Sequence, residues 1–295
     1  MYFWHRLIYY FRRKQQPLQR IYLDHASATP MFAKATKAMQ PYFREKFANA
    51  SAIHSEGRKA KEALELAREK IARVLQVRDE HIVFTSGGTE SNNLAILGYL
   101  RTLHETGRPY TEMSLLTTAI EHPATLRACA EAERLGVRIK YLPLNEVGQI
   151  DLDKLPEVIS TDTVLLSVAH INSEIGVVQP TQAIARKLRQ IAKTESFATT
   201  PLLHIDAAQS PLWYKCELDR LGADMLSLDA AKCGGPKGVG ILAFFQKRTI
   251  THGILYGGGQ EYGLRPGTEP VALIVGAKEA LLEAQATCEK RSAAV

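Results

Sequence analysis

Cysteine is scarce in this sequence, and a long apolar run is missing. Four cysteines stand among 295 residues, at Cys129, Cys216, Cys233 and Cys288, and none has CxxC spacing. This scarcity argues against a disulfide framework and a structural zinc site, and it favours a reducing compartment, which we expect to be the cytoplasm. No stretch is long and apolar enough to span a bilayer. We therefore expect a globular protein without a metal site or a membrane span.

Acidic residues are absent from the first 20 positions, where five Lys or Arg residues lie. Such a segment can contact nucleic acid or membrane, but the formal charge of the whole chain is only +6, and a solvated leader is the simpler interpretation. Residues 2–11 are aromatic and amphipathic, without the charge order or cleavage site of a signal peptide. We expect residues 1–20 to be an extension that binds no nucleic acid. Contact of residues 2–11 with a membrane surface or a partner stays open.

Short apolar runs alternate with helical patterns from about residue 55 onward. The runs are rich in β-branched and aliphatic residues, which predicts strands at 81–86, 114–118, 138–142, 163–168, 202–206 and 224–228. Helical patterns lie at 56–75, 90–103, 124–135, 151–160 and 181–193. Alternation of this kind predicts an α/β fold with a mostly parallel sheet and helices on both faces. The link 234–238 is too short for a crossover, so the strand at 239–245 is expected to run antiparallel.

Lys232 follows the last of these parallel strands, where a lysine is costly unless it is paired, shifted in pKa or used covalently. Asp206 follows another strand, and ligands of parallel sheets bind at the carboxyl ends of the strands. A lysine and a carboxylate facing one pocket fit pyridoxal phosphate (PLP), whose aldehyde bonds to lysine and whose ring nitrogen pairs with aspartate. The alternative is a solvated Lys232 in a plain hairpin turn.

Other polar residues also follow strands, and each has a structural alternative. Gly88 and Thr89 stand in a glycine-rich turn before a helix, a combination that binds phosphate but also caps ordinary helices. His122 precedes Pro123 and can stack on a ring, although most histidines are packed or exposed. For Asn172 the alternative is a turn residue, and for Asp206, which lies three residues before Gln209, it is a helix cap.

Six segments taken together resemble the cysteine desulfurases, which are class V, fold-type-I PLP enzymes. The resemblance runs from about Ile21 to about Glu283. Its segments are IYLDHASATP (21–30), FTSGGTESNNLAILG (84–98), HINSEIGVVQP (170–180), HIDAAQS (204–210), KCGGPKGVG (232–240) and GGGQEYGLRPGTEP (257–270).

The resemblance implies a role for each residue of the site. Lys232 would hold the cofactor covalently and move the substrate proton, and His122 would stack on the ring as the second catalytic residue. Asp206 would pair with the ring nitrogen. Further contacts to the cofactor are implied for Gly88, Thr89, Asn172, Gln209 and, across a homodimer interface, Thr268. The implied reaction removes sulfur from L-cysteine, leaves L-alanine and passes a persulfide to an acceptor protein, as in iron–sulfur cluster assembly.

Two positions beside the lysine depart from the family pattern. Asp229 stands where the family presents serine to the phosphate, and Ala231 stands where it presents histidine. A carboxylate beside a phosphate dianion is repulsive, and loss of the histidine removes a phosphate contact, so both changes predict weaker PLP binding.

The end of the sequence departs from the family as well. It stops at Val295, before the region that carries the family's catalytic cysteine and the arginine that binds the substrate carboxylate. We expect an extension at 1–20, a large PLP domain at 21–280 and the start of a truncated C-terminal domain at 281–295. None of the four cysteines is predicted to form the persulfide. A selenocysteine lyase-like enzyme and a non-catalytic PLP-fold subunit remain alternatives.

Overall fold

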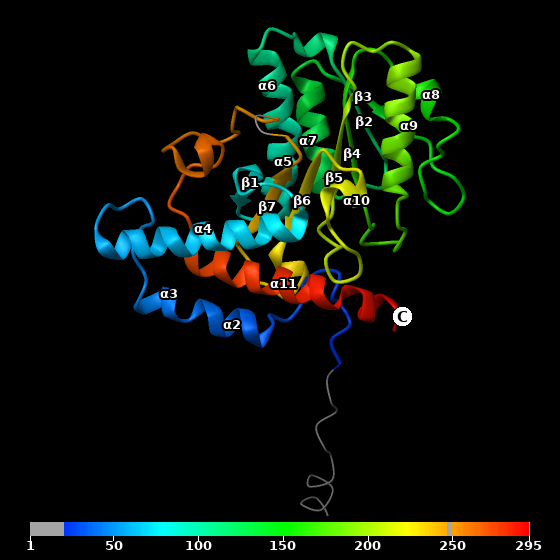
Figure 1. Cartoon of the computed structure of the whole chain (residues 1–295). Coiled ribbons are helices and arrows are strands. Elements are labelled where there is room, and N and C mark those ends of the chain that lie inside the picture. The colour runs from blue at the N-terminus through cyan, green and yellow to red at the C-terminus, as the bar shows by residue number, and fades with distance from the viewer. Residues whose placement is uncertain (1–20, 247–248, 295) are drawn as a thin grey trace, which may run out of the picture.

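The computed structural model describes residues 21–246 and 249–294, which build a seven-stranded sheet in the order β1-β7-β6-β5-β4-β2-β3 (Figure 1). Strands β2 to β6 run parallel to their neighbours among themselves, whereas β7 is antiparallel to both β1 and β6. The predicted antiparallel last strand is therefore confirmed. The strands are β1 (Ile82–Thr85), β2 (Ser114–Thr117), β3 (Arg138–Tyr141), β4 (Thr163–Ala169), β5 (Leu202–Asp206), β6 (Met225–Asp229) and β7 (Gly240–Phe244).

Helices cover both faces of this sheet, as the alternating pattern predicted. Strand residues alternate between two buried clusters: Ile82 and Phe84 of β1 belong to one, and Val83 belongs to the other. The first cluster also contains residues of α4 (Ser55–Leu75), α9 (Thr181–Thr194) and α11 (Val271–Ser292). The second contains residues of the π-helix η2 (Leu94–Gly98), α6 (Tyr99–Glu105) and α7 (Pro123–Arg134).

Shorter elements complete the chain. In Figure 1, α2 and α3 lie beside α11, and both contact it. The remaining helices are α2 (Ala33–Met39), α3 (Pro41–Arg44), α5 (Gly88–Asn93), α8 (Leu155–Val158) and α10 (Leu218–Leu221), with 3-10 turns η1 (Asp79–His81), η3 (Tyr110–Glu112), η4 (Ala230–Lys232) and η5 (Gln260–Gly263). The described part of the chain contains no helix with the length and apolar character needed to cross a membrane.

The helix predicted at 151–160 is wrong in extent, because only α8 (Leu155–Val158) forms there. Pro156 explains the difference: proline has no amide hydrogen, so it is tolerated in the first turn of a helix and disruptive in the middle. A helix that began at residue 151 would place Pro156 at its centre, whereas a start at Leu155 places it in the first turn.

Two further predictions from the sequence concern the first 20 residues and the C-terminal helix. The predicted extension at residues 1–20 lies outside the described residues. The predicted domain boundary between residues 280 and 281 falls inside α11, which continues to Ser292, and it stays a prediction.

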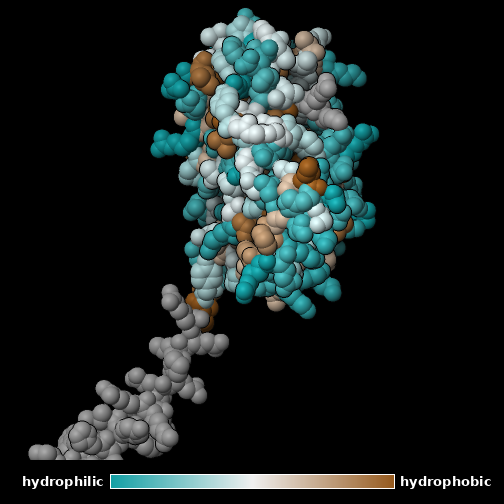
Figure 2. Space-filling model, turned by 90° about the vertical axis from the view of Figure 1, so that its left-hand side faces the viewer, coloured by the Kyte–Doolittle hydropathy of each residue, from teal (hydrophilic) through white to brown (hydrophobic). Residues whose placement is uncertain are grey.

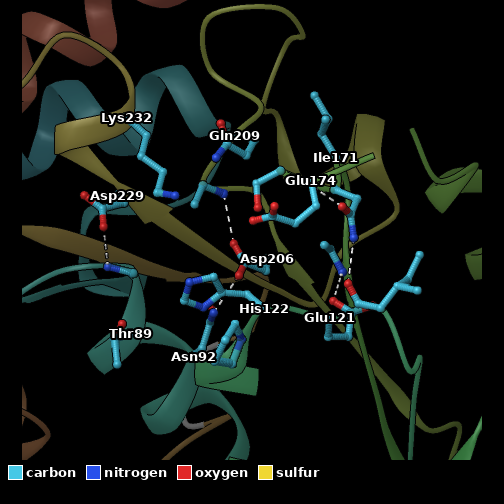
Figure 3. A pocket seen from close by; sticks show the side chains of 17 residues that line it. Thr89, Asn92, Glu121, His122, Ile171, Glu174, Asp206, Gln209, Asp229 and Lys232 are labelled. Carbon is cyan, nitrogen blue, oxygen red and sulfur yellow. Dashed lines mark hydrogen bonds between the residues drawn. The ribbon is translucent and has the colours of Figure 1, made fainter. Parts of the chain in front are cut away.

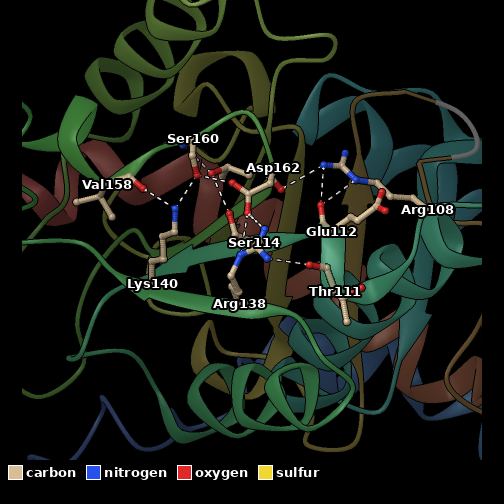
Figure 4. A network of polar contacts seen from close by, with 10 residues as sticks. Arg108, Thr111, Glu112, Ser114, Arg138, Lys140, Val158, Ser160 and Asp162 are labelled. Carbon is tan, nitrogen blue, oxygen red and sulfur yellow. Dashed lines mark hydrogen bonds and ion pairs between the residues drawn. The ribbon is translucent and has the colours of Figure 1, made fainter.

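A polar network ties the amino ends of β2, β3 and β4 at the edge of the sheet that lies away from the site described below (Figure 4). Arg138 of β3 donates from Nε to Asp162 Oδ2 at 3.1 Å. Lys140 donates to the Ser160 hydroxyl at 2.6 Å. Ser114 of β2 and Thr163 of β4 share a hydrogen bond of 3.0 Å. These contacts tie the amino ends of three strands together, and the opposite ends of β2 and β4 contribute residues to the site.

One buried ion pair holds α4, β1 and η5 together. Arg68 donates to both carboxylate oxygens of Glu261, at 2.9 and 2.6 Å, and the two side chains are 3% and 2% exposed. Glu261 also accepts from the amide of Phe84, and Arg68 donates to the carbonyl of Ile82. Glu261 and Tyr262 adopt left-handed φ values of 47° and 61°, a conformation that non-glycine residues rarely hold without tertiary contacts. The pair therefore anchors a strained turn onto the sheet.

We predict that Arg68→Leu lowers the free energy of unfolding by about 3–5 kcal/mol, because it leaves the Glu261 carboxylate buried without its counter-charge. The matched control is Arg134→Leu, since Arg134 makes the same two-pronged contact to Glu131 on the exposed surface of α7. Urea unfolding followed by circular dichroism measures both variants. Equal losses in the two variants would contradict the anchoring role of Arg68.

Candidate active site

A pocket of about 160 Å³ lies at the carboxyl ends of the strands. Figure 3 shows side chains from several strand ends and helix starts converging on it. Predicted site residues that line the pocket are Gly88, Thr89, His122, Asn172, Asp206, Gln209, Asp229 and Lys232. Ala231 and Thr268 do not belong to this lining in the described chain, and Thr268 is exposed. The structure thus brings most of the predicted residues together, and their roles stay predictions.

Lys232 ends η4 and is only partly exposed at the pocket wall. Its Nζ donates to the carbonyl oxygen of Ala26 at 3.2 Å, and Gln209 donates to the same oxygen at 2.8 Å. The segment that contains Ala26 is held against η4 by Thr29, whose amide donates to the Ala231 carbonyl at 2.9 Å. The lysine is therefore tethered by a single weak neutral acceptor, which a covalent ligand could displace.

Asp206 ends β5 and is 8% exposed. One carboxylate oxygen accepts from Asn92 Nδ2 at 2.6 Å, and the other accepts from the Ala208 amide at 3.0 Å. Two donors thus fix the orientation of the carboxylate on the pocket floor. The competing prediction of a helix cap fits poorly, because a turn and not a helix follows β5.

Asn92 is a site residue that the sequence analysis missed. It is buried, lines the pocket, and its Oδ1 has no hydrogen-bond partner among the described residues. A buried acceptor without a partner costs free energy unless a ligand brings a donor. The available signal was spacing, since Asn92 lies four residues after Gly88 on the same helical face.

His122 caps α7, and its Nδ1 accepts from the Ala124 amide at 3.1 Å. A neutral ring with this contact carries its hydrogen on Nε2. In Figure 3 the imidazole lies beside Asp206 in the pocket. An exposed ring fixed by its own backbone is suited to stack on a flat ligand.

Asn172 lies in the turn after β4, and its contacts support the turn alternative as well as a site role. Its Nδ2 donates to the Ile120 carbonyl at 2.6 Å, and its Oδ1 accepts from the amides of Glu174 and Ile175. An amide group carries two hydrogens on nitrogen, so one donor of Asn172 is left over for a ligand in the pocket.

Glu121 is a second pocket residue for which the sequence predicted a place after a strand, beside His122, but no chemical role. It is 7% exposed, lines the pocket, and accepts from the Thr118 hydroxyl at 2.6 Å and the Ala169 amide at 2.7 Å. Burial raises the pKa of this carboxyl group to about 7, and the negative charge of Asp206 adds to the effect. Its position next to His122 after a strand was the only sequence signal.

The glycine-rich turn carries an unexpected contact. Asp229 ends β6, and its Oδ2 accepts from the Gly88 amide at 3.1 Å, while its Oδ1 accepts from the Ala231 amide at 2.9 Å. The carboxylate of Asp229, which stands where the family has serine, therefore points into the glycine-rich turn that is predicted to bind phosphate. Ala231 itself offers only its backbone there.

All four cysteines are buried in the structure. Burial raises the pKa of Cys129 and of Cys233 to about 12 and raises that of Cys216 well above its usual range. A thiol of this kind is a poor nucleophile at neutral pH, because the reactive form is the thiolate. The expectation that none of them forms a persulfide is consistent with this burial.

The pocket's donor set fits PLP at its ring and aldehyde ends. Lys232 offers an amine, Asp206 offers a fixed carboxylate, and Asn92 offers a buried acceptor that lacks a donor. A protonated ring nitrogen is the kind of donor that such a carboxylate and amide accept from. The phosphate end is contested by Asp229.

We predict that Glu121→Gln flattens the pH dependence of stability. A carboxyl group whose folded pKa is about 7 rather than 4.5 stabilises the fold below pH 4.5 and loses that contribution as pH rises through 7. Relative to the variant, the native chain should lose about 3 kcal/mol of unfolding free energy between pH 5 and pH 8. Urea unfolding at both pH values tests this, and parallel curves for the two proteins would contradict it.

Comparison with known proteins places this site in a family. The family model described as aminotransferase class-V matches residues 21–291. A protein named cysteine desulfurase IscS from Dictyoglomus turgidum is 41% identical over 263 residues, which cover 89% of this chain and 63% of that protein. A mitosomal cysteine desulfurase from Trachipleistophora hominis is 39% identical, over 92% of this chain and 58% of its own length. The chain thus spans less than two thirds of these curated relatives.

Solved structures agree with this result. A NifS-like protein superposes with a TM-score of 0.84 at 34% identity, covering 92% of this chain and 71% of the other. SspA, solved in complex with cysteine, gives a TM-score of 0.78 at 36% identity, over 89% and 72% of the two chains. The predicted fold class is confirmed, and so is PLP as the family's cofactor. With a matching family model over nearly its whole described length, this chain belongs to the class-V aminotransferases.

Proposed function

We propose that this chain works with PLP as a cysteine desulfurase, which converts L-cysteine to L-alanine and passes the sulfur to a thiol. The observation that carries the proposal is the convergence of Lys232 and Asp206 on one pocket, in a chain 41% identical to a protein named cysteine desulfurase. The selenocysteine lyase-like alternative would use the same two residues, and no contact in the pocket favours it.

Bound PLP would supply an aldehyde that takes up the amine of the amino acid and a ring that holds the negative charge left at its Cα. Asp206, oriented by Asn92 and the Ala208 amide, would hold the ring nitrogen. His122 would cover one face of the ring. Asn172 and Gln209 would contact the ring oxygen, with Gln209 exchanging its present bond to Ala26.

Lys232 would carry the cofactor between reactions and move the proton at Cα during them. Its Nζ is bound only to the Ala26 carbonyl among the described residues, so a small rotation of the side chain releases it. An amine that alternates between a covalent bond and a free base suits proton transfer, because lysine is flexible and responds to its surroundings.

The sulfur needs an acceptor thiol that the four buried cysteines do not provide. The reaction balances as cysteine plus a thiol giving alanine plus a persulfide. The acceptor thiolate attacks the substrate sulfur, the Cβ–S bond breaks, and its electron pair stays with the carbon, which takes up a proton. We propose that the thiol comes from outside residues 21–294, on an acceptor protein or another segment.

Several finer expectations belong to the same proposal. We propose a homodimer in which Thr268 of the partner subunit reaches the pocket, since Thr268 is exposed and lies away from this chain's own pocket. We also propose that the enzyme is cytoplasmic and that it feeds iron–sulfur cluster assembly, and the IscS name of several relatives supports the second of these. Residues 21–280 would form the PLP domain, and 281–295 would open the next.

We predict that the protein releases alanine from L-cysteine in the presence of PLP and a small thiol acceptor such as dithiothreitol. Lys232→Ala should lower the rate at least ~10³-fold, because it removes both the covalent anchor and the proton carrier. Lys237→Ala is the matched control, since this lysine lies five residues on and is exposed. It should keep full activity.

Alanine is quantified by chromatography, and sulfide release is measured in parallel. Alanine without sulfide or persulfide would indicate a different lyase. Equal rates in Lys232→Ala and in the unaltered protein would contradict the proposal.

A further inference from the structure

The turn predicted to hold the cofactor's phosphate already has side-chain acceptors from the same chain. It contains three successive backbone amides, and such amides at the start of a helix are what binds an anion. The Ser86 amide donates to Glu90 at 2.6 Å, and the Gly87 amide donates to the Thr85 hydroxyl at 3.4 Å. The Gly88 amide donates to Asp229 at 3.1 Å. Two of the three acceptors are carboxylates.

Asp229 is held firmly in this position. Both of its oxygens are used, one by Gly88 and one by the Ala231 amide, and a Cβ placed on Gly88 would come within 3.3 Å of its Oδ2. Figure 3 shows the carboxylate pointing at the start of α5, next to Thr89. The carboxylate thus already occupies the Gly88 amide, one of the donors on which the predicted phosphate site depends.

The charge of the pocket favours the same conclusion. Four carboxyl groups line it, and Lys232 is the one Lys or Arg in the described lining. A phosphate dianion that enters beside Asp229 meets a like charge within a few ångströms in a partly desolvated site, where screening is weak. The acidic lining residues are Glu121, Glu174, Asp206 and Asp229.

We propose that the Asp229 carboxylate takes the place of the cofactor's phosphate in this glycine-rich turn. As a consequence, the pocket binds PLP with little preference over pyridoxal, the aldehyde that lacks the phosphate. The inference rests on the proposed function, because it assumes that Lys232 and Asp206 hold the ring. Pyridoxal needs no anion cradle and leaves the bond from Gly88 to Asp229 in place. PLP has to displace that bond and bring two negative charges next to the carboxylate.

The test is a binding titration of the full chain with PLP and with pyridoxal, followed by the new visible absorbance and by quenching of tryptophan fluorescence. In the unaltered protein the two dissociation constants should lie within about tenfold of each other. Asp229→Ser should lower the dissociation constant for PLP by at least ~10-fold, and Asp229→Asn should lower it equally through loss of charge alone. In both variants the dissociation constant for pyridoxal should stay within about twofold of its value in the unaltered protein. Asp219→Ser, which removes an exposed carboxylate elsewhere, should change neither constant.

Circular dichroism confirms that each variant is folded. Two results would overturn the role of Asp229: an equal gain in affinity for PLP and pyridoxal, or an unaltered affinity for PLP in both Asp229 variants. Either result would leave the proposed function standing. Failure of both aldehydes to bind any of the proteins would reject the proposed function, and this inference with it.

Discussion

The pairing of β7 between β1 and β6 is the constraint on which the site depends. Gly240 of β7 is the register partner of Thr85 at the end of β1 and of Asp229 at the end of β6. This double pairing brings the glycine-rich turn and the lysine segment together, although about 140 residues separate them. A Cβ at position 240 would lie 2.5 Å from the Gly87 backbone, so only glycine permits the approach. The face of the molecule that Figure 2 shows is mainly hydrophilic, with scattered apolar patches.

Much of this arrangement was predictable from the sequence, because its signals are local. Buried strands show as short aliphatic runs, and polar residues that directly follow parallel strands must gather at one edge of the sheet. Lys232, Asp206 and His122 were found in this way, and the comparisons confirmed the family that their motifs suggested.

The remaining features depend on contacts between distant segments, which no local pattern reveals. Asn92 became a site residue only when its bond to Asp206 was known, across 114 positions. Glu121 bridges the ends of β2 and β4. The bond between Asp229 and Gly88 spans 141 positions, so the sequence marked Asp229 as unusual without showing where its carboxylate lies. The extent of α8 was missed for a local reason, because the place of Pro156 was overlooked.

The central claim is that Lys232 is the residue that holds the cofactor. The most direct measurement incubates the protein with PLP, reduces it with sodium borohydride to make the lysine–cofactor bond permanent, and maps the peptides by mass spectrometry. The account predicts one added cofactor mass, on the peptide that contains Lys232. A label spread over exposed lysines such as Lys237, or no label at all, would contradict it.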